Sequence, residues 1–200
     1  MLCGGSDEVH HSVTGVFDVV KAASSRNQTP ELTPSPFDRD RDGVVCGEGS
    51  GIILLENYDS AVARGAKIYA EVLGFGTVND SKHIANPHEK AMARAMTNSL
   101  LEASVEPNEI DYVNAHATGT EQGDVAESSA VHIVLGKDTP VSSLKGHIGH
   151  TLGAAGSLET IAVLEMMERQ ELIPTRNLVN SDPLCEDIFL LQEKKKQRVH

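Results

Sequence analysis

The sequence Tyr112-Val113-Asn114-Ala115-His116-Ala117-Thr118-Gly119-Thr120 contains the pattern that decides the fold. An apolar run leads into His116, small residues surround the histidine, and a segment with helical spacing follows. Residues 141–156 (VSSLKGHIGHTLGAAG) have the same order, with Lys145 and His150 after the apolar run. A strand, a tight turn and a helix place a side chain at the carboxyl end of a strand, where α/β proteins bind ligands. The pattern therefore predicts that two histidines and a lysine converge at one sheet edge.

Composition and charge limit the possible classes of function. The chain has 200 residues, 40% of them hydrophobic, which suffices for one domain with a core. Its formal net charge of −12 argues against nucleic acid as a partner, and we interpret the basic run at 194–196 as a solvated strand or loop end. No apolar run is long enough to span a membrane, and no signal peptide opens the sequence. Three widely separated cysteines without a C-x-x-C pair favour a reducing compartment, so we expect a cytoplasmic protein.

Hydrophobic spacing predicts alternating strands and helices. We expect strands at residues 1–6 (buried), 52–55, 68–78, 110–114, after Pro140 and at 187–191, and helices at 8–23, 58–64, 86–103, 120–135 and 154–169. Asn86 is the expected cap of the third helix, with Pro87 in its first turn and Glu89 completing a capping box. This alternation predicts a layered α/β/α fold around a mostly parallel or mixed sheet.

Two further segments have competing interpretations. Residues 36–43 (PFDRDRDG) are rich in aspartate, as calcium loops are, but lack the late glutamate of that motif. We favour a charged turn with internal Asp–Arg pairs over a calcium site. Residues 46–51 (CGEGSG) have the glycines of a dinucleotide loop, but the apolar run at 52–55 follows them, so they open a strand rather than a helix. We therefore reject nucleotide binding at this segment.

The histidine segments predict a site that stabilises negative charge on oxygen. Thr118 and Thr120 offer hydroxyl groups beside His116, and a lysine near His150 can keep its imidazole neutral and able to donate a hydrogen bond. His147 is interpreted as a bystander that a tight turn points elsewhere. The pair His147 and His150 has tolerable spacing for zinc, but Lys145 would repel a cation. We expect neither a metal nor a cofactor.

Three segments together resemble β-ketoacyl-acyl-carrier-protein synthases, the condensing enzymes of fatty-acid and polyketide synthesis. They are residues 116–127 (HATGTEQGDVAE), 143–156 (SLKGHIGHTLGAAG) and 37–51 (FDRDRDGVVCGEGSG). The resemblance covers nearly the whole chain in the right order. It implies a thiolase-type fold, a homodimer or heterodimer, and acyl carrier protein as a partner. A degradative thiolase shares that fold, but the lysine and the paired histidines disfavour it.

The resemblance also implies roles for individual residues in a decarboxylating Claisen condensation. His116 and His150 match the histidines that stabilise the malonyl enolate, and Lys145 matches a lysine that supports them. Glu159 matches a glutamate that pairs with this lysine. Thr118 and Thr120 match threonines that hydrogen-bond the phosphopantetheine arm.

The sequence departs from the family at the nucleophile. The family's cysteine lies in an elbow upstream of this sequence, and none of Cys3, Cys46 and Cys185 has that context. We expect residues 1–64 to be the end of the amino-terminal half and residues 65–200 to be the carboxyl-terminal half, truncated before its last strands. The partial thiolase-like fold should expose apolar surface, and the chain alone should be inactive. The alternative is a non-catalytic partner subunit of the chain-length-factor kind.

Overall fold

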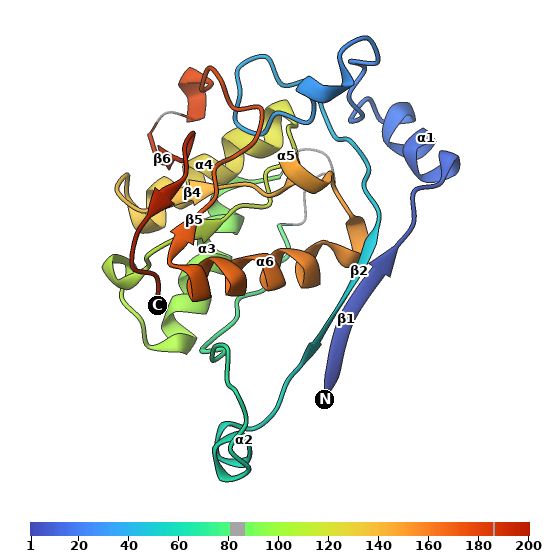
Figure 1. The fold of residues 1–200 in the computed structure, drawn as a ribbon. Coiled ribbons are helices and arrows are strands. Elements are labelled where there is room, and N and C mark those ends of the chain that lie inside the picture. The colour runs from blue at the N-terminus through green and yellow to red at the C-terminus, as the bar shows by residue number, and fades with distance from the viewer. Residues whose placement is uncertain (81–86, 186) are drawn as a thin grey trace.

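The computed structural model describes residues 1–80, 87–185 and 187–200 (Figure 1). The strands are β1 (Leu2–Asp7), β2 (Gly49–Leu54), β3 (Val113–Asn114), β4 (Pro140–Ser142), β5 (Glu171–Leu172), β6 (Phe189–Leu190) and β7 (Lys195–Lys196). The α-helices are α1 (His11–Val19), α2 (Tyr58–Ala63), α3 (Glu89–Ala103), α4 (Glu121–Leu135), α5 (Lys145–Ile148) and α6 (Ala155–Arg169). Short 3₁₀ turns occupy Pro30–Leu32, Pro107–Glu109, Leu152–Ala154 and Pro183–Cys185. None of the described helices is both long enough and apolar enough to cross a membrane.

The centre of the fold is a parallel sheet in the order β3-β4-β6. Because side chains alternate along a strand, neighbouring residues serve two different cores. Val113 and Val141 pack in the core that also contains Val131 of α4. Tyr112 and Leu191 pack in a second core, which contains these residues of α6: Ala162, Val163, Met166 and Met167. The predicted α/β/α layering is therefore confirmed, with a parallel sheet here and antiparallel pairs elsewhere.

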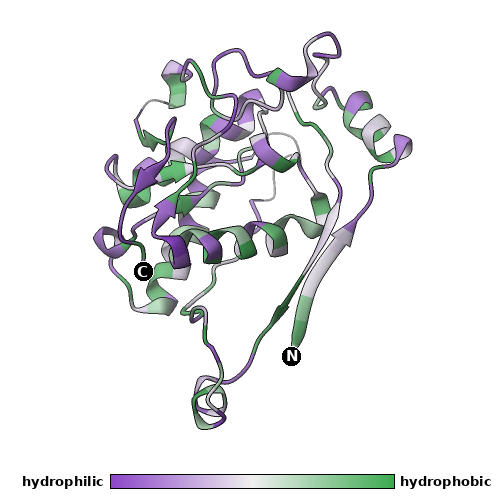
Figure 2. Cartoon of the chain, viewed as in Figure 1, coloured by the Kyte–Doolittle hydropathy of each residue, from purple (hydrophilic) through white to green (hydrophobic). Residues whose placement is uncertain are grey.

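Strands β1 and β2 form an antiparallel ribbon that contacts the amino-terminal part of α6 (Figure 1). A Cβ at Gly51 would lie 2.7 Å from Oγ of Ser157, so only glycine permits this close contact. On the opposite face of the ribbon, Leu2 pairs with Leu54, and the exposed fractions of these two residues are 73% and 61%. Figure 2 shows this end of the ribbon in the colours of hydrophobic residues. The first strand is thus present as predicted, but it is not buried, because no described residue covers that face.

Several predicted boundaries are wrong. Residues 68–78 are not a strand; a Cβ at Gly76 would collide with the carbonyl oxygen of Ala95, so this segment runs against α3 instead of pairing. Helix α1 is shorter than predicted and buries no residue. Helix α3 begins after His88 rather than after Asn86. The imidazole of His88 caps the helix, because its Nδ1 accepts a hydrogen bond from Lys90 N (3.1 Å). Asn86 lies outside the described residues.

The carboxyl-terminal region adds elements that hydrophobic spacing does not reveal. The strand expected at 187–191 is β6, but it is not the last one, because β7 follows and pairs with β5. The basic run at 194–196 therefore includes a short strand, as one of the two interpretations of that run predicts. Helix α5 forms where a glycine-rich turn was expected.

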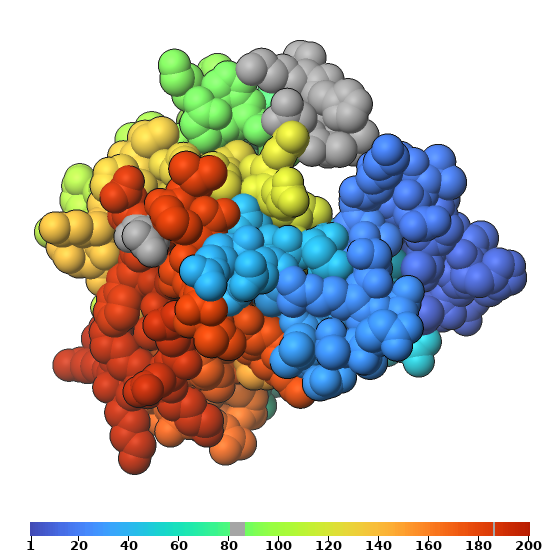
Figure 3. All heavy atoms as spheres, turned by 90° about the horizontal axis from the view of Figure 1, so that it is seen from above, coloured from blue at the N-terminus to red at the C-terminus, as the bar shows by residue number. Residues whose placement is uncertain are grey.

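The charged segment at 36–43 lies between two distant parts of the chain. Gly43 N donates to Gly119 O at 2.9 Å, and Arg39 N donates to Asn180 O at 2.9 Å. Figure 3 shows the segment in light blue between the red carboxyl-terminal residues and the yellow residues near the start of α4. One internal pair, Arg39 with Asp40 at 3.6 Å, agrees with the predicted charged turn. The stronger contacts of the segment are long-range.

Candidate active site

His116 and His150 lie next to each other, as the sequence pattern predicts. The centroids of their rings are 5.2 Å apart, and the ring planes are at 87°. His116 follows β3 by two residues, and His150 follows α5 by two residues. The backbone of His150 is fixed on both sides, because its N–H donates to Val45 O (2.8 Å) and its carbonyl oxygen accepts from Gly47 N (2.9 Å). The segments at residues 112–120 and 141–156 thus meet in one site.

Lys145 lies buried beneath this pair, with an exposed fraction of 1%. Its Nζ donates to Oε1 of Glu159 on α6 at 2.5 Å. The other carboxylate oxygen, Oε2, accepts from Nδ2 of Asn114 at 2.8 Å. A buried ammonium group is tolerated only with such a partner, because removing an isolated charge from water costs several kcal/mol, an order-of-magnitude figure. The predicted pairing of Lys145 with Glu159 is therefore present in the structure.

Both imidazoles are held in the neutral form. Burial lowers the pKa of His116 below its usual value, and the positive charge of Lys145 lowers it further. Burial also lowers the pKa of His150 to about 4, with additional contributions from Lys145 and His116. Nδ1 of His150 accepts a hydrogen bond from Leu152 N at 3.3 Å, which places the ring proton on Nε2. The site therefore presents a neutral N–H donor at neutral pH.

Two carboxylates of α4 hold the loop that carries His116. Glu127 accepts from the amides of His116 and Ala117, both at 2.7 Å. Oδ1 of Asp124 accepts from the amides of Thr118 (3.1 Å) and Gly119 (3.3 Å). Four consecutive amides are thus bound by side chains three residues apart on one helix face. Burial raises the pKa of Asp124 to about 6 and that of Glu127 to about 7.

The sequence motifs alone do not indicate a role for Asp124, Glu127 or Asn114. Asp124 and Glu127 do occur in the quoted motif, and their spacing of three residues on a predicted helix was the available signal. It indicates a shared face but not what that face binds. Asn114 precedes His116 by two residues at the end of a strand, and only the packing of α6 brings a carboxylate to it.

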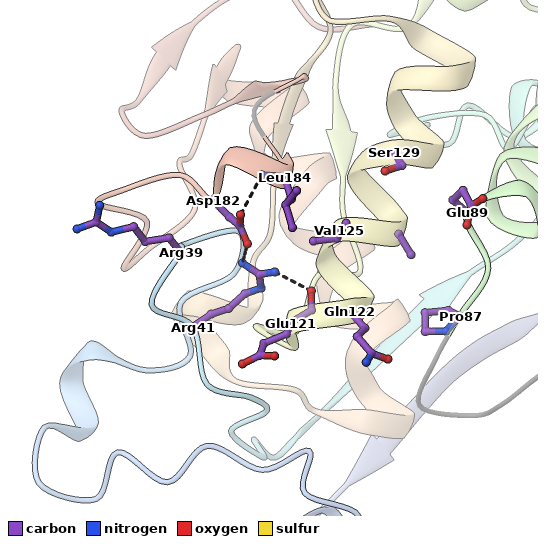
Figure 4. A pocket seen from close by; sticks show the side chains of 11 residues that line it. Arg39, Arg41, Pro87, Glu89, Glu121, Gln122, Val125, Ser129, Asp182 and Leu184 are labelled. Atoms are coloured by element: carbon purple, nitrogen blue, oxygen red, sulfur yellow. Dashed lines mark hydrogen bonds and ion pairs between the residues drawn. The ribbon is translucent and has the colours of Figure 1, made fainter.

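Arg41 ties the charged segment to the start of α4. Its Nη1 donates to Asp182 at 2.6 Å, and its Nε lies 3.6 Å from Oδ2 of Asp124. Nη2 donates to the carbonyl oxygen of Glu121 at 2.6 Å (Figure 4). An open pocket lies beside this arginine, and none of the predicted site residues lines it. Arg41 therefore supports the loop with His116 from the side away from the histidine pair.

The two threonines lie near each other at the turn before α4. Oγ1 of Thr118 donates to Oγ1 of Thr120 at 3.2 Å. Thr120 is the residue before the first turn of α4, as predicted, but its side chain makes no capping hydrogen bond. His147 is not part of the pair of imidazoles: its Nε2 lies 2.9 Å from Pro174 O. This contact agrees with its interpretation as a bystander.

The three cysteines are not joined in disulfides. Cys3 and Cys46 are half-buried free thiols, and Cys185 is a buried one. Burial raises the pKa of Cys185 to about 11, which disfavours a thiolate at neutral pH. In the described ranges, no group of three or more histidine, cysteine, aspartate or glutamate residues is arranged to hold a metal ion.

Comparison with known proteins supplies the family. Residues 69–179 match "Beta-ketoacyl synthase, C-terminal domain", and residues 1–61 match "Beta-ketoacyl synthase, N-terminal domain". The chain is 44% identical to 3-oxoacyl-[acyl-carrier-protein] synthase 2 of Vibrio cholerae over 189 residues, which are 91% of this chain and 46% of that protein. It therefore spans about half the length of the curated relatives that it matches.

Solved structures agree with this comparison. A β-ketoacyl synthase from Burkholderia phymatum is 47% identical, with a TM-score of 0.95 over 98% of this chain and 48% of that one. A type II polyketide synthase acyl-carrier protein in complex with its ketosynthase, bound to the hexaketide, matches with 34% identity and a TM-score of 0.93, over 99% of this chain and 51% of that one. The expected partial thiolase-like fold is thereby confirmed. The family match covers more than half of the sequence, and the chain belongs to the β-ketoacyl synthase family.

Proposed function

We propose that this chain forms the enolate-stabilising part of a β-ketoacyl-acyl-carrier-protein synthase. The observation that carries the proposal is the perpendicular pair of neutral imidazoles, His116 and His150, beside the buried pair of Lys145 and Glu159. Neutral N–H donors that are already oriented stabilise an oxyanion without reorganising during the reaction. The substrate is a malonyl thioester on acyl carrier protein, in fatty-acid or polyketide synthesis.

The reaction is a decarboxylating Claisen condensation, an acyl transfer. The bond between the malonyl carboxylate and the α-carbon breaks, CO₂ leaves, and the electron pair becomes an enolate. His116 and His150 donate hydrogen bonds to the thioester oxygen, where the negative charge collects. The α-carbon then attacks the acyl thioester on a cysteine, a carbon–carbon bond forms, and the thiolate leaves. Burial keeps both imidazoles neutral and the charge of Lys145 adds to this effect, while Thr118 and Thr120 bind the phosphopantetheine arm.

We propose that the nucleophilic cysteine comes from outside these 200 residues. The high pKa of Cys185 argues against it as a nucleophile, and Cys3 lies within strand β1, where it pairs with Ile53 of β2 rather than sitting in a nucleophile elbow. Cys46 bridges the backbone of His150, but it lies in the glycine-rich segment rather than in a nucleophile elbow. The chain alone is therefore inactive in condensation. The division proposed at residues 64 and 65 is supported by the two family matches.

Acyl carrier protein and a second synthase subunit are the proposed partners, in a homodimer or heterodimer. Support comes from the ketosynthase that was solved in complex with its acyl-carrier protein. A soluble, cytoplasmic enzyme agrees with this assignment.

A chimeric synthase tests the proposal. The matching segment of the Vibrio cholerae relative is replaced by this chain, and CO₂ release from malonyl-carrier protein is measured. His116→Ala and His150→Ala should each reduce the rate by about 10²–10³-fold, the usual loss on removing one oxyanion donor. His147→Ala is the matched control and should change the rate little, because its ring contacts Pro174 O. Retention of the rate in both of the first two variants would refute the proposal.

The same assay separates the alternative, a non-catalytic subunit of the chain-length-factor kind. The specific observation in its favour is that none of the three cysteines has the environment of a nucleophile. A subunit without a catalytic site would not require its histidines. A chimera that folds and releases no CO₂, although both His116 and His150 are present, would favour this alternative.

A further inference from the structure

Asn114 is a polar residue whose side chain contacts Glu159, the partner of Lys145. It ends β3 and pairs with Ser142 of β4 in the parallel sheet. A carboxylate can only accept hydrogen bonds, so the contact with Glu159 fixes the amide nitrogen of Asn114 toward that group. The carbonyl oxygen Oδ1 consequently faces away; it is buried and has no hydrogen-bond partner among the residues that the structure describes. Such an orphaned acceptor is costly, which indicates that the contact made by Nδ2 outweighs the loss.

The two donors on Glu159 define how its carboxylate lies. Oε1 accepts from Lys145 at 2.5 Å, and Oε2 accepts from Asn114 at 2.8 Å. With one donor on each oxygen, the carboxylate cannot rotate without losing a charge-assisted hydrogen bond. It is held on Lys145, and no hydrogen bond joins it to either imidazole.

We propose that Asn114 is a positioning residue that holds the Glu159 carboxylate against Lys145 and thereby keeps the charge of Lys145 compensated beside His116 and His150. Only the catalytic consequence of this inference rests on the proposed function. Asn114 touches neither imidazole, so it acts through Glu159.

The charged groups around the histidines give the direction of the effect. Lys145 lowers the pKa of both rings, and Glu159 raises it in both cases. Asp7, at the end of β1, also raises the pKa of His150, and His116 lowers it. Glu127 on α4 lies within the field of Lys145 too. A change that moves the Glu159 carboxylate away from Lys145 therefore leaves the charge of Lys145 less compensated and lowers the pKa of both imidazoles further.

The substitution Asn114→Leu tests this directly in the 200-residue chain. It removes the donor at similar size and leaves the charge count unchanged. NMR titration with ¹³C-labelled imidazole groups measures the effect, because a carboxylate released by Asn114 compensates the charge of Lys145 less. The pKa of His116 and of His150 should fall. A merely loosened structure would instead move the histidines upward, toward their usual pKa of 6.5.

Controls separate positioning from folding. Asn108→Leu, at an exposed residue of a 3₁₀ turn, should leave the titrations of both histidines unchanged. In a Glu159→Gln background, Asn114→Leu should shift neither histidine, because the carboxylate it acts through is gone. If leucine is not tolerated, Asn114→Val serves instead, because valine suits a strand. The same shifts are expected for it as for Asn114→Leu.

Three results would overturn the inference. The first is a histidine pKa that stays the same or rises in Asn114→Leu, and the second is an equal shift in the Glu159→Gln background. The third is loss of the folded state in both the Leu and the Val variants, which would show that Asn114 serves the fold itself. None of these readouts uses activity, so their failure would leave the histidine assay of the proposed function unaffected.

Discussion

The loop at residues 116–119 and the ribbon of β1 and β2 use their surfaces in opposite ways. In the loop, four consecutive amides are bound by two buried carboxylates, Asp124 and Glu127. In the ribbon, one face packs on α6 through glycines, while the other exposes residues such as Ile52, at 70%. The loop finds every partner within the chain, whereas the apolar face of the ribbon has none among the described residues. The difference indicates that the loop with His116 is supported from within the described residues, whereas the apolar face of the ribbon is left exposed there.

The largest predicted loss of stability comes from a substitution at Arg41, which supports the loop with His116. The substitution Arg41→Met leaves Asp124 and Asp182 without their buried cation, and it strands the carbonyl oxygen of Glu121. Breaking a buried ion pair by removing one partner costs about 3–5 kcal/mol. We expect the free energy of unfolding to fall by this amount in urea denaturation monitored by circular dichroism.

Arg39→Met is the matched control for this variant. Arg39 lies in the same segment, but its side chain is 59% exposed and pairs with an equally exposed Asp40. Exposed pairs contribute about 0–1 kcal/mol. Equal losses in the two variants would contradict the claim that the long-range contacts of Arg41 hold the loop.

A second prediction concerns pH and Glu127. Its pKa is raised to about 7 from a usual value of 4.5, so it ionises later in the folded chain than in the unfolded one. The free energy of unfolding should therefore fall as pH rises from about 4.5 to about 7, by roughly 3 kcal/mol for this group. Glu127→Gln lacks this titration. Its destabilisation relative to wild type should be largest near pH 5 and smallest above pH 7.

Urea titrations at several pH values measure this difference. Glu121→Gln is the control, because Glu121 is an exposed residue in the first turn of the same helix. Its difference from wild type in the free energy of unfolding should not follow this pH profile. A Glu127→Gln difference that is constant from pH 5 to 8 would show that the buried carboxyl does not ionise in this range.

The smallest effect on stability is expected at the ribbon. Ile52→Lys places a charge on an exposed face, so the free energy of unfolding should change by less than about 0.5 kcal/mol. Self-association should nevertheless decrease, because exposed apolar patches promote it. Light scattering of the isolated chain provides the measurement. Val179→Lys, at an exposed residue outside the ribbon, is the control and should leave association unchanged.

The sequence was sufficient for the elements with long, regular spacing. Helices α4 and α6 and the strand–turn–histidine segments follow from local patterns, and so does the meeting of His116 with His150. The pairing of Lys145 with Glu159 was anticipated from the family resemblance rather than from spacing. Elements of two to four residues, such as β5, β7 and α5, are too short to give a periodic signal.

The remaining contacts depend on tertiary packing. Arg41 sits in an alternating run of charges, which suggests ion pairs within the run. Within the run its side chain donates to the carbonyl oxygen of Asp38, but its carboxylate partners, Asp124 and Asp182, lie far away in the sequence. Residues 68–78 contain β-branched and aromatic residues, but the close approach of Gly76 to α3 overrides that preference. In the same way, no local pattern shows that Asn114 faces a glutamate of α6.

The titration of the two imidazoles tests the central claim most directly. NMR of the folded chain should find a pKa below 6.5 for His116, a pKa of about 4 for His150, and the proton of the neutral His150 ring on Nε2. Two rings that titrate at the ordinary pKa of 6.5, with no sign of the charge on Lys145, would contradict it.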